Sequence, residues 1–312
     1  MPTGKIKSSY FTLETLADGV YAAIAKKGEG AMGNSGIIDI GKEVVIFDTF
    51  TTPNAARELR QLAEDITQKG VKYVLNSHYH GDHTFGNQIF EDVIIISTTK
   101  TRNLHMDKNM ILDPNKEMEE TKKYLNQLEA RLEEELNPIL RTSLEIQLKE
   151  MKKVHESIPE LQIVLPNLTF ENRLVLHGET RTVEFCCFGG GHTPSDAFLY
   201  LPEEKIAFMG DIVLENLHPP IYNSQEFINN LIKISELDIQ RIVPGHGNLV
   251  TKSQIDLMLD YLHQLNAKVG HALEKGNTLE QILAFETPEE YSTWTGIDGY
   301  KRNLNTVYNE LR

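Results

Sequence analysis

The sequence predicts a single α/β domain over residues 1–312 that carries an inserted helical segment. β-like and helix-like patterns alternate over the first hundred residues, and the β pattern returns after about residue 160. Between these parts, about residues 101–158 are rich in Glu, Lys and Leu, and no glycine occurs between Gly86 and Gly178. The last part, about residues 251–312, is mainly helical in pattern, and no linker or internal repeat divides the chain.

The elements of both halves follow from local signals. In the first half, β-like runs cover residues 19–25, 35–40, 43–47, 72–76 and 93–97. Thr52 and Pro53 are typical of a helix N-cap and first helical position, and apolar spacing extends this helix to about Gln68. In the second half, β-like runs cover residues 162–165, 174–176, 182–188, 197–200, 206–209 and 241–243, with a helix at 227–237.

The inserted segment predicts two amphipathic helices. Apolar residues recur at helical spacing from Met118 to Leu136, and the period resumes at Leu140 after Pro138 interrupts it. The simplest interpretation is a solvated helical hairpin. The alternative is a lid or a dimerisation arm beside a binding site. In the second case the protein would form a homodimer.

Composition and charge exclude several classes of protein. The formal net charge of −14 disfavours nucleic-acid partners, which need clusters of Lys and Arg. No apolar run is long enough for a membrane-spanning helix, so we expect no membrane partner. Residues 1–20 lack the apolar stretch of a signal peptide, and adjacent Cys186 and Cys187 suit buried, reduced thiols. We therefore expect a cytoplasmic protein.

The stretch VLNSHYHGDHTFGN, residues 74–87, concentrates ligand-type side chains at a strand end. His78 and His80 are two residues apart, so in extended chain they point the same way and can hold one ion. Asp82 and His83 follow Gly81, which permits a sharp change of direction toward a second ion. Core packing does not produce an HxHxDH spacing, which therefore predicts a metal site.

Three later turns offer further ligands, because one turn cannot complete two coordination spheres. Each is a β-like run that ends in a ligand beside glycine: His192 in FGGGHTP, Asp211 in FMGD and His246 in PGHG. Glycine permits the close backbone approach that a crowded site needs.

The motifs HxHxDH, GGGHTPSD, FMGD and PGHG, in this order, resemble the metallo-β-lactamase superfamily. The resemblance implies a four-layer αββα sandwich of two mixed β-sheets (α/β, or α+β in some schemes) with a dinuclear site at one edge. It implies three ligands for a first metal, three for a second and one bridge: His78, His80 and His192; Asp82, His83 and His246; and Asp211. The implied cofactors are two Zn²⁺, with iron or manganese as alternatives.

Asp48 follows the β-like run at residues 43–47 and matches an aspartate that the family places behind the metal histidines. Such a carboxylate accepts an imidazole N–H and fixes the histidine tautomer. A turn residue that caps toward Thr52 is the other interpretation.

The metals define the expected chemistry, since two close cations make hydroxide available near neutral pH and polarise a carbonyl. Asp82 and Asp211 are the candidate catalytic residues, because they could accept or relay a proton. We expect a dinuclear zinc hydrolase whose metal-bridging hydroxide attacks a small ester, thioester, lactone or lactam. A mononuclear iron dioxygenase acting on a persulfide and a non-catalytic metal-stabilised binding protein are the alternatives.

Candidate substrate contacts come from loops beside the ligand motifs. Their alternative interpretation is ordinary loop polarity. They are Asn34 and Ser35 in a glycine-rich loop, Thr193 and Ser195 beside His192, and His218 and Tyr222 after Asp211.

Overall fold

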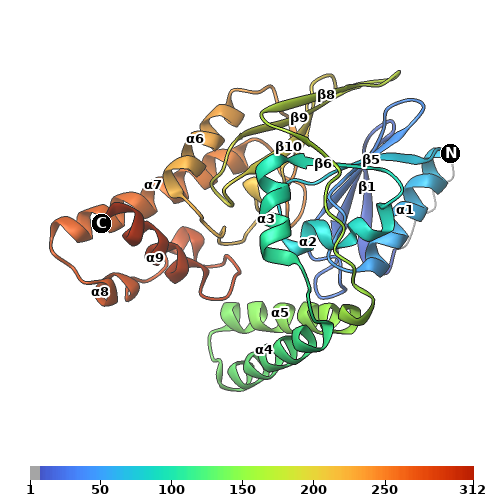
Figure 1. Cartoon of the computed structure of the whole chain (residues 1–312). Coiled ribbons are helices and arrows are strands. Elements are labelled where there is room, and N and C mark those ends of the chain that lie inside the picture. The colour runs from blue at the N-terminus through green and yellow to red at the C-terminus, as the bar shows by residue number, and fades with distance from the viewer. Residues whose placement is uncertain (1–7) are drawn as a thin grey trace.

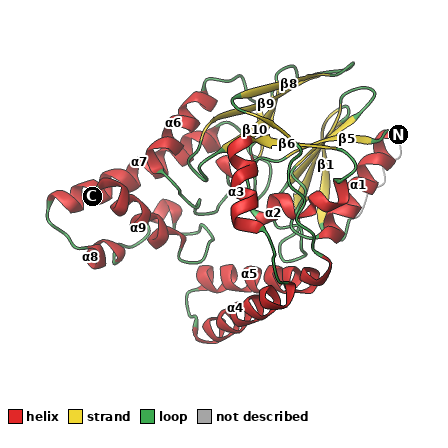
Figure 2. Ribbon diagram, viewed as in Figure 1, coloured by secondary structure: helices red, strands yellow, loops and turns green. Residues whose placement is uncertain are grey.

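Two mixed β-sheets lie face to face in the computed structural model, which describes residues 8–312 (Figures 1 and 2). The first sheet has the order β1-β2-β3-β4-β5-β6-β7 and the second the order β12-β11-β10-β9-β8. In the first sheet, β1 to β4 pair antiparallel and β4 to β7 pair parallel. In the second, only β11 and β12 pair parallel.

The strands have these bounds: β1 Phe11–Ala17, β2 Val20–Ala25, β3 Ser35–Asp39, β4 Val44–Phe47, β5 Val71–Leu75, β6 Ile94–Thr98, β7 Leu168–Phe170, β8 Arg173–His177, β9 Thr182–Gly189, β10 Asp196–Leu201, β11 Ile206–Phe208 and β12 Arg241–Val243. The helices are α1 Pro53–Thr67, α2 Gly81–Thr84, α3 Thr99–Asn109, α4 Pro114–Glu134, α5 Pro138–Ser157, α6 Ser224–Ser235, α7 Ser253–Glu274, α8 Leu279–Leu283 and α9 Gly299–Leu311. Short 3-10 helices are η1 Phe85–Phe90, η2 Ile158–Glu160, η3 Gly210–Ile212 and η4 Glu289–Tyr291.

Three apolar clusters define the layers of the fold. One lies between the sheets and joins residues such as Phe47 of β4 to Phe185 of β9 and Phe208 of β11. A second packs α1 on the outer face of the first sheet. The third packs α6, α7 and α9 on the outer face of the second sheet. Helices therefore cover both outer faces, and the expected αββα sandwich is confirmed.

Most of the expected elements appear within one or two residues of the expected bounds. Thr52 caps α1 by accepting from the Ala55 N–H, and Pro53 is the first helical residue, as expected. One expected strand is wrong: residues 162–165 form no strand, and β7 begins only at Leu168. There, the Val164 carbonyl accepts from the Asn87 side chain, and Pro166 has no N–H for a ladder.

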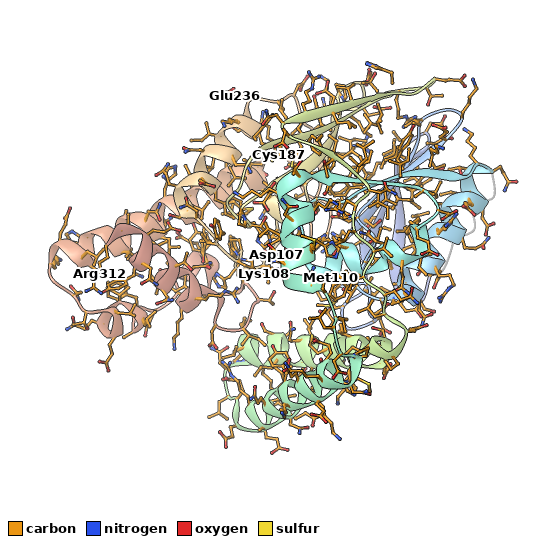
Figure 3. The ribbon with its side chains drawn as sticks, viewed as in Figure 1. Asp107, Lys108, Met110, Cys187, Glu236 and Arg312 are labelled. Carbon is orange, nitrogen blue, oxygen red and sulfur yellow. The ribbon has the colours of Figure 1, made fainter. Side chains whose placement is uncertain are left out.

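The inserted segment contains three helices rather than the two that the sequence pattern predicts. The first, α3, contacts β6 and β7, so it belongs to the body of the sandwich. Figure 3 shows Asp107, Lys108 and Met110 at the end of α3, from which the chain continues into the hairpin of α4 and α5. This hairpin projects to one side of the sheets (Figure 1), with Leu125, Leu128 and Leu144 buried.

Candidate metal centre

The ligand residues meet where strand ends from both sheets come together. Asp48 follows β4 and His78 follows β5, while Asp211 follows β11 and His246 follows β12. Each of these strand pairs is parallel, so the residues that follow the two strands leave the sheet at the same edge. His192 joins them from the turn between β9 and β10. Backbone bonds couple the sheets here, since the Ala197 N–H donates to the Ser77 carbonyl at 2.9 Å.

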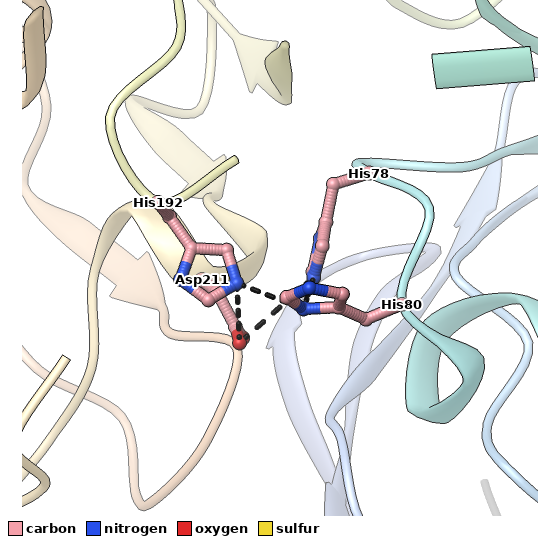
Figure 4. Close-up of side chains that lie close together, drawn as sticks. All are labelled: His78, His80, His192 and Asp211. Atoms are coloured by element: carbon pink, nitrogen blue, oxygen red, sulfur yellow. Dashed lines mark hydrogen bonds and ion pairs between the residues drawn. The ribbon is translucent and has the colours of Figure 1, made fainter. Parts of the chain in front are cut away.

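One cluster joins three imidazole nitrogens and a carboxylate oxygen (Figure 4). His80 Nδ1 lies 3.0 Å from His78 Nε2 and 3.0 Å from His192 Nε2. Asp211 Oδ2 lies 3.3 Å from His192 Nε2 and 3.9 Å from His78 Nε2. We call His78, His80, His192 and this oxygen of Asp211 the first cluster.

A second cluster lies beside it and shares Asp211. His246 Nε2 lies 3.1 Å from Asp82 Oδ2, and His83 Nε2 lies 3.6 Å from the same oxygen. Asp211 Oδ1 lies 3.2 Å from His83 Nε2 and 3.4 Å from His246 Nε2. The two oxygens of Asp211 therefore face different clusters, as a bridging carboxylate requires.

The donor atoms fit metal ions in spacing and in chemistry. With bonds of about 2.0–2.1 Å, neighbouring ligand atoms of a tetrahedral zinc site lie about 3.3–3.4 Å apart. Most separations within the clusters are close to that value. His83 Nε2 and Asp211 Oδ1 are buried, and among the described residues neither has a hydrogen-bond partner. Buried polar atoms are rarely left without partners, so these two atoms suit a cation between them.

Electrostatics differ between the clusters. Burial lowers the pKa of His78 well below its usual value and that of His192 to about 4, so both rings are neutral, as metal ligands are. Burial also opposes charge on His83 and His246. Nearby carboxylates, Asp211 foremost, outweigh it and raise the pKa of His83 well above normal and that of His246 to about 10. A cation in the second cluster would therefore displace protons, which makes its affinity pH-dependent.

Asp48 supports the ligands from behind and is fully buried. Its Oδ2 lies 2.8 Å from His83 Nδ1 and accepts from Ser77 Oγ at 2.7 Å, while its Oδ1 accepts from the Ser77 N–H. Ser77 Oγ in turn lies 2.9 Å from His78 Nδ1. One carboxylate thus orients histidines of both clusters, which is the geometry expected for a residue that fixes imidazole tautomers.

Glycines allow the close approach that the sequence motifs predict. A Cβ atom at Gly245 would lie 2.0 Å from Asp211 Oδ1, and one at Gly33 would lie 2.9 Å from His83 Nε2. Any larger residue at Gly245 would displace the bridging carboxylate.

The expected substrate contacts have other partners in the structure, and none of the six lines the cavity at the metal centre. The Asn34 amide donates to the Pro244 and Gly247 carbonyls and so holds the loop that carries His246. Ser35 donates to the Asp48 carbonyl. Thr193 and Ser195 are buried and bond within their own turn and to Thr98.

His218 and Tyr222 are also placed differently from the sequence expectation. His218 is buried, bonds Tyr261 Oη through Nδ1 at 3.2 Å and lies among the rings of Tyr261, Trp294 and Tyr300. Tyr222 is exposed. The chain nevertheless stays beside the metal centre after η3, since Leu217 and Pro220 line the cavity and the Tyr222 N–H donates to the Gly191 carbonyl.

A cavity of about 310 Å³ lies at the metal centre, lined by residues of both clusters. Part of its wall comes from residues close to the ligands along the chain, such as Leu217, Pro220 and Asn248. Another part comes from Ser143, Ile146, Gln147 and Glu150 of α5, so the inserted segment borders the site as its lid alternative expected, and from the loop Thr295–Ile297. The spacing of the α5 residues marks one helix face, but this pattern alone does not distinguish a cavity wall from a packing face.

The chain belongs to the metallo-β-lactamase superfamily. The family model described as the metallo-beta-lactamase superfamily matches residues 28–246, which include every expected ligand. Among solved structures, a metallo-beta-lactamase from Pontibacter korlensis has a TM-score of 0.59 at 16% identity, with 81% of this chain and 99% of that chain covered. The DIM-1 metallo-beta-lactamase has a TM-score of 0.57 at 15% identity, with 82% and 98% covered. These likenesses show the fold.

A curated relative, "Beta-lactamase-like protein 2 homolog" from Caenorhabditis elegans, is 36% identical over 62 residues. The match spans 20% of this chain and 21% of that protein. It supports the family assignment and leaves the activity of this chain to be proposed.

The structure bears on two expectations, the lack of a membrane-spanning helix and the reduced state of the cysteines. Within residues 8–312, no helix is both long enough and apolar enough to cross a bilayer. Cys186 and Cys187 are both free, with Cys186 buried and Cys187 half-buried. The absence of a signal peptide concerns a segment that begins in residues 1–7, outside the described residues.

Proposed function

We propose that the protein is a dinuclear zinc hydrolase that cleaves a small ester, thioester, lactone or lactam. The observation that carries the proposal is the pair of ligand clusters that share Asp211, each with donor atoms within 4.8 Å of one another. His78, His80 and His192 would hold the first zinc ion, and Asp82, His83 and His246 the second. Asp211 would bridge them.

The ions, when bound, would supply a water of lowered pKa and a Lewis acid for the substrate carbonyl. The side chains of the protein would position the ions and transfer protons. Asp82 and Asp211 would accept a proton from the attacking water, a role that their position in the cavity lining supports. Asp48 holds His83 in one orientation and, through Ser77, holds His78. No serine or cysteine nucleophile is required, and both cysteines have pKa values that burial raises.

The cavity supports a small-molecule substrate. Its volume of about 310 Å³ lies at the lower end of the range for small-ligand sites. The acidic overall charge of −14 disfavours a nucleic acid in this position.

The experiment is metal analysis of the purified protein, followed by hydrolysis of a panel of esters, thioesters, lactones and lactams. We expect about two zinc ions per chain, activity that a chelator removes and zinc restores, and loss of activity in Asp211→Ala. Asp92→Ala, at an exposed ion pair with Arg60, is the matched control. About one iron per chain with oxygen uptake on a persulfide would replace this proposal with the dioxygenase. Bound metal without turnover of any compound would favour the binding protein.

A further inference from the structure

The α4–α5 hairpin forms part of the cavity wall. Ser143, Ile146, Gln147 and Glu150 are spaced as i, i+3, i+4 and i+7, so they share one face of α5. All four line the same cavity as His80, Asp82 and His246. The helix therefore presents side chains to any substrate that reaches the metal centre.

Polar contacts fix this wall to the body of the protein. Ser143 Oγ accepts from the Gly296 N–H at 3.1 Å, and Arg131 of α4 pairs with Asp298 at 2.8 Å. Nearer the C-terminal end of α5, Glu150 Oε1 accepts from the Gly28 N–H at 3.2 Å. The hairpin is thus tied to two separate loops that border the cavity, which gives the α5 face a defined position.

Glu150 is the unusual residue of this face, because it is a carboxylate with only 8% of its surface exposed. Within residues 8–312, it has one hydrogen bond, from Gly28, and no ion pair with lysine or arginine. Burial raises its pKa, although the Gly28 N–H and the nearby charges of His246 and Lys27 act in the opposite direction. A buried carboxylate is costly unless a cation or several donors satisfy it.

The other charged residues of the wall do not share this condition. Glu215 accepts from the Asn216 amide and the Asn248 N–H, so both of its oxygens have partners. Lys27 is exposed. Among residues 8–312, Glu150 is therefore a buried carboxylate of the wall without a lysine or arginine ion pair, and it faces a cavity large enough to hold a cationic group.

Apolar side chains surround the space that remains. Ile24, Ile146, Leu217 and Ile297 line the cavity together with Glu150 and the metal ligands. A ligand that fits this lining has a carbonyl for the metal centre, a short apolar body and a cationic end.

We propose that Glu150 determines substrate specificity by binding a positively charged ammonium group on the substrate. The substrate class is then a small ester, thioester, lactone or lactam that carries an ammonium group beyond a short apolar segment. This inference rests on the proposed function for the carbonyl, but the ammonium site itself does not depend on turnover.

The first test measures binding without catalysis. Zinc-loaded protein is titrated with benzylammonium and, separately, with its neutral analogue benzyl alcohol, by ligand-observed NMR. Hydrogen bonds to charged groups predict a preference for the ammonium of about tenfold or more. Glu150→Gln should abolish that preference while it keeps the shape and an oxygen for the Gly28 N–H. Glu145→Gln, at an exposed ion pair on the same helix, removes the same charge and should change nothing.

Equal binding of the two compounds to the wild type would overturn the proposal, and so would a preference that survives in Glu150→Gln. The second test compares an ammonium-bearing ester with its neutral isostere. We expect Glu150→Gln to raise KM about tenfold for the charged ester alone, with kcat nearly unchanged. If neither ester is hydrolysed by any variant, the proposed function fails while the binding titration still decides the ammonium site.

Discussion

Asp48→Asn tests whether one buried carboxylate controls metal affinity at the second cluster. Asp48 Oδ1 accepts from the Ser77 N–H at 2.8 Å, and Oδ2 lies 2.8 Å from His83 Nδ1. Asparagine has the same shape, and it tolerates the left-handed backbone of this position, where φ is 55°. The substitution therefore changes the hydrogen-bonding pattern while it leaves the turn intact.

The expected effect follows from the tautomer of His83. The amide oxygen of the asparagine can still accept a hydrogen bond from the Ser77 N–H. The NH₂ group then lies against His83 Nδ1. His83 Nδ1 must then accept a hydrogen bond from this NH₂ group. The ring proton therefore moves to Nε2, the atom that faces Asp82 and Asp211. Loss of such a supporting partner weakens metal binding about ten- to hundredfold, which corresponds to about 1–3 kcal/mol. The first cluster should change less, because Asp48 contacts His83 directly but reaches His78 only through Ser77 Oγ.

The assay is competition for zinc between stripped protein and a chromophoric chelator, fitted with two sites. Asp92→Asn, at an exposed ion pair with Arg60, is the matched control and should bind like the wild type. Equal weakening of both sites, or unchanged affinity at both, would refute the orientation argument. Thermal unfolding of the metal-free proteins checks that the variant still folds.

Three further predictions concern packing and pH. Gly245→Ala places a Cβ 2.0 Å from Asp211 Oδ1, so zinc stoichiometry and activity should both fall, whereas Gly270→Ala, whose nearest neighbour is 3.9 Å away, should retain them. Burial lowers the pKa of His218 to about 4 from 6.5, so only the unfolded state gains this proton as pH falls through that window. His218 should then contribute a drop of about 3 kcal/mol in the free energy of unfolding between pH 6.5 and 4, and His218→Phe should remove that contribution in denaturant titrations. Leu144→Ala empties a fully buried site in α5 and should cost about 2–5 kcal/mol. Amide hydrogen exchange in α4 and α5 should become faster. Unchanged exchange rates there would contradict the inference that Leu144 stabilises the hairpin.

Local signals in the sequence predicted an α/β domain and most of its strands, and the resemblance to the family predicted the αββα sandwich. Glycine turns, β-branched runs and the Thr52–Pro53 cap each act within a few residues. Residues 162–165 show the limit of this reasoning: their composition suits a strand, but the Asn87 side chain occupies the Val164 carbonyl. That contact joins residues 77 positions apart, and no local pattern encodes it.

The ligand residues could also be predicted from the sequence, because ligand-type side chains recur beside glycine at strand ends. Their division into two sets came from the resemblance to the family. The cavity wall could not be predicted, and three of the predicted substrate contacts show why. Asn34, Ser35 and Thr193 lie beside the ligands in sequence, so they serve as the scaffold that positions those ligands. Other residues that lie close to ligands along the chain, such as Leu217, Pro220 and Asn248, do line the cavity. The rest of the wall includes residues of α5 and of the loop Thr295–Ile297, which are distant from the ligands in sequence.

Glu150 illustrates why such a wall is hard to find from sequence. On an amphipathic helix rich in Glu and Lys, one more glutamate is indistinguishable from its exposed neighbours. Only the fold reveals that Glu145 faces solvent while Glu150 is covered by the loop at Gly28. The two residues are five positions apart along α5, more than one turn, and this separates a surface ion pair from a buried carboxylate that lines the cavity. Specificity in this protein is therefore expected to depend on the register of the hairpin: a one-residue insertion before Glu150 should rotate it by about 100° and abolish ammonium binding, while zinc stoichiometry remains unchanged.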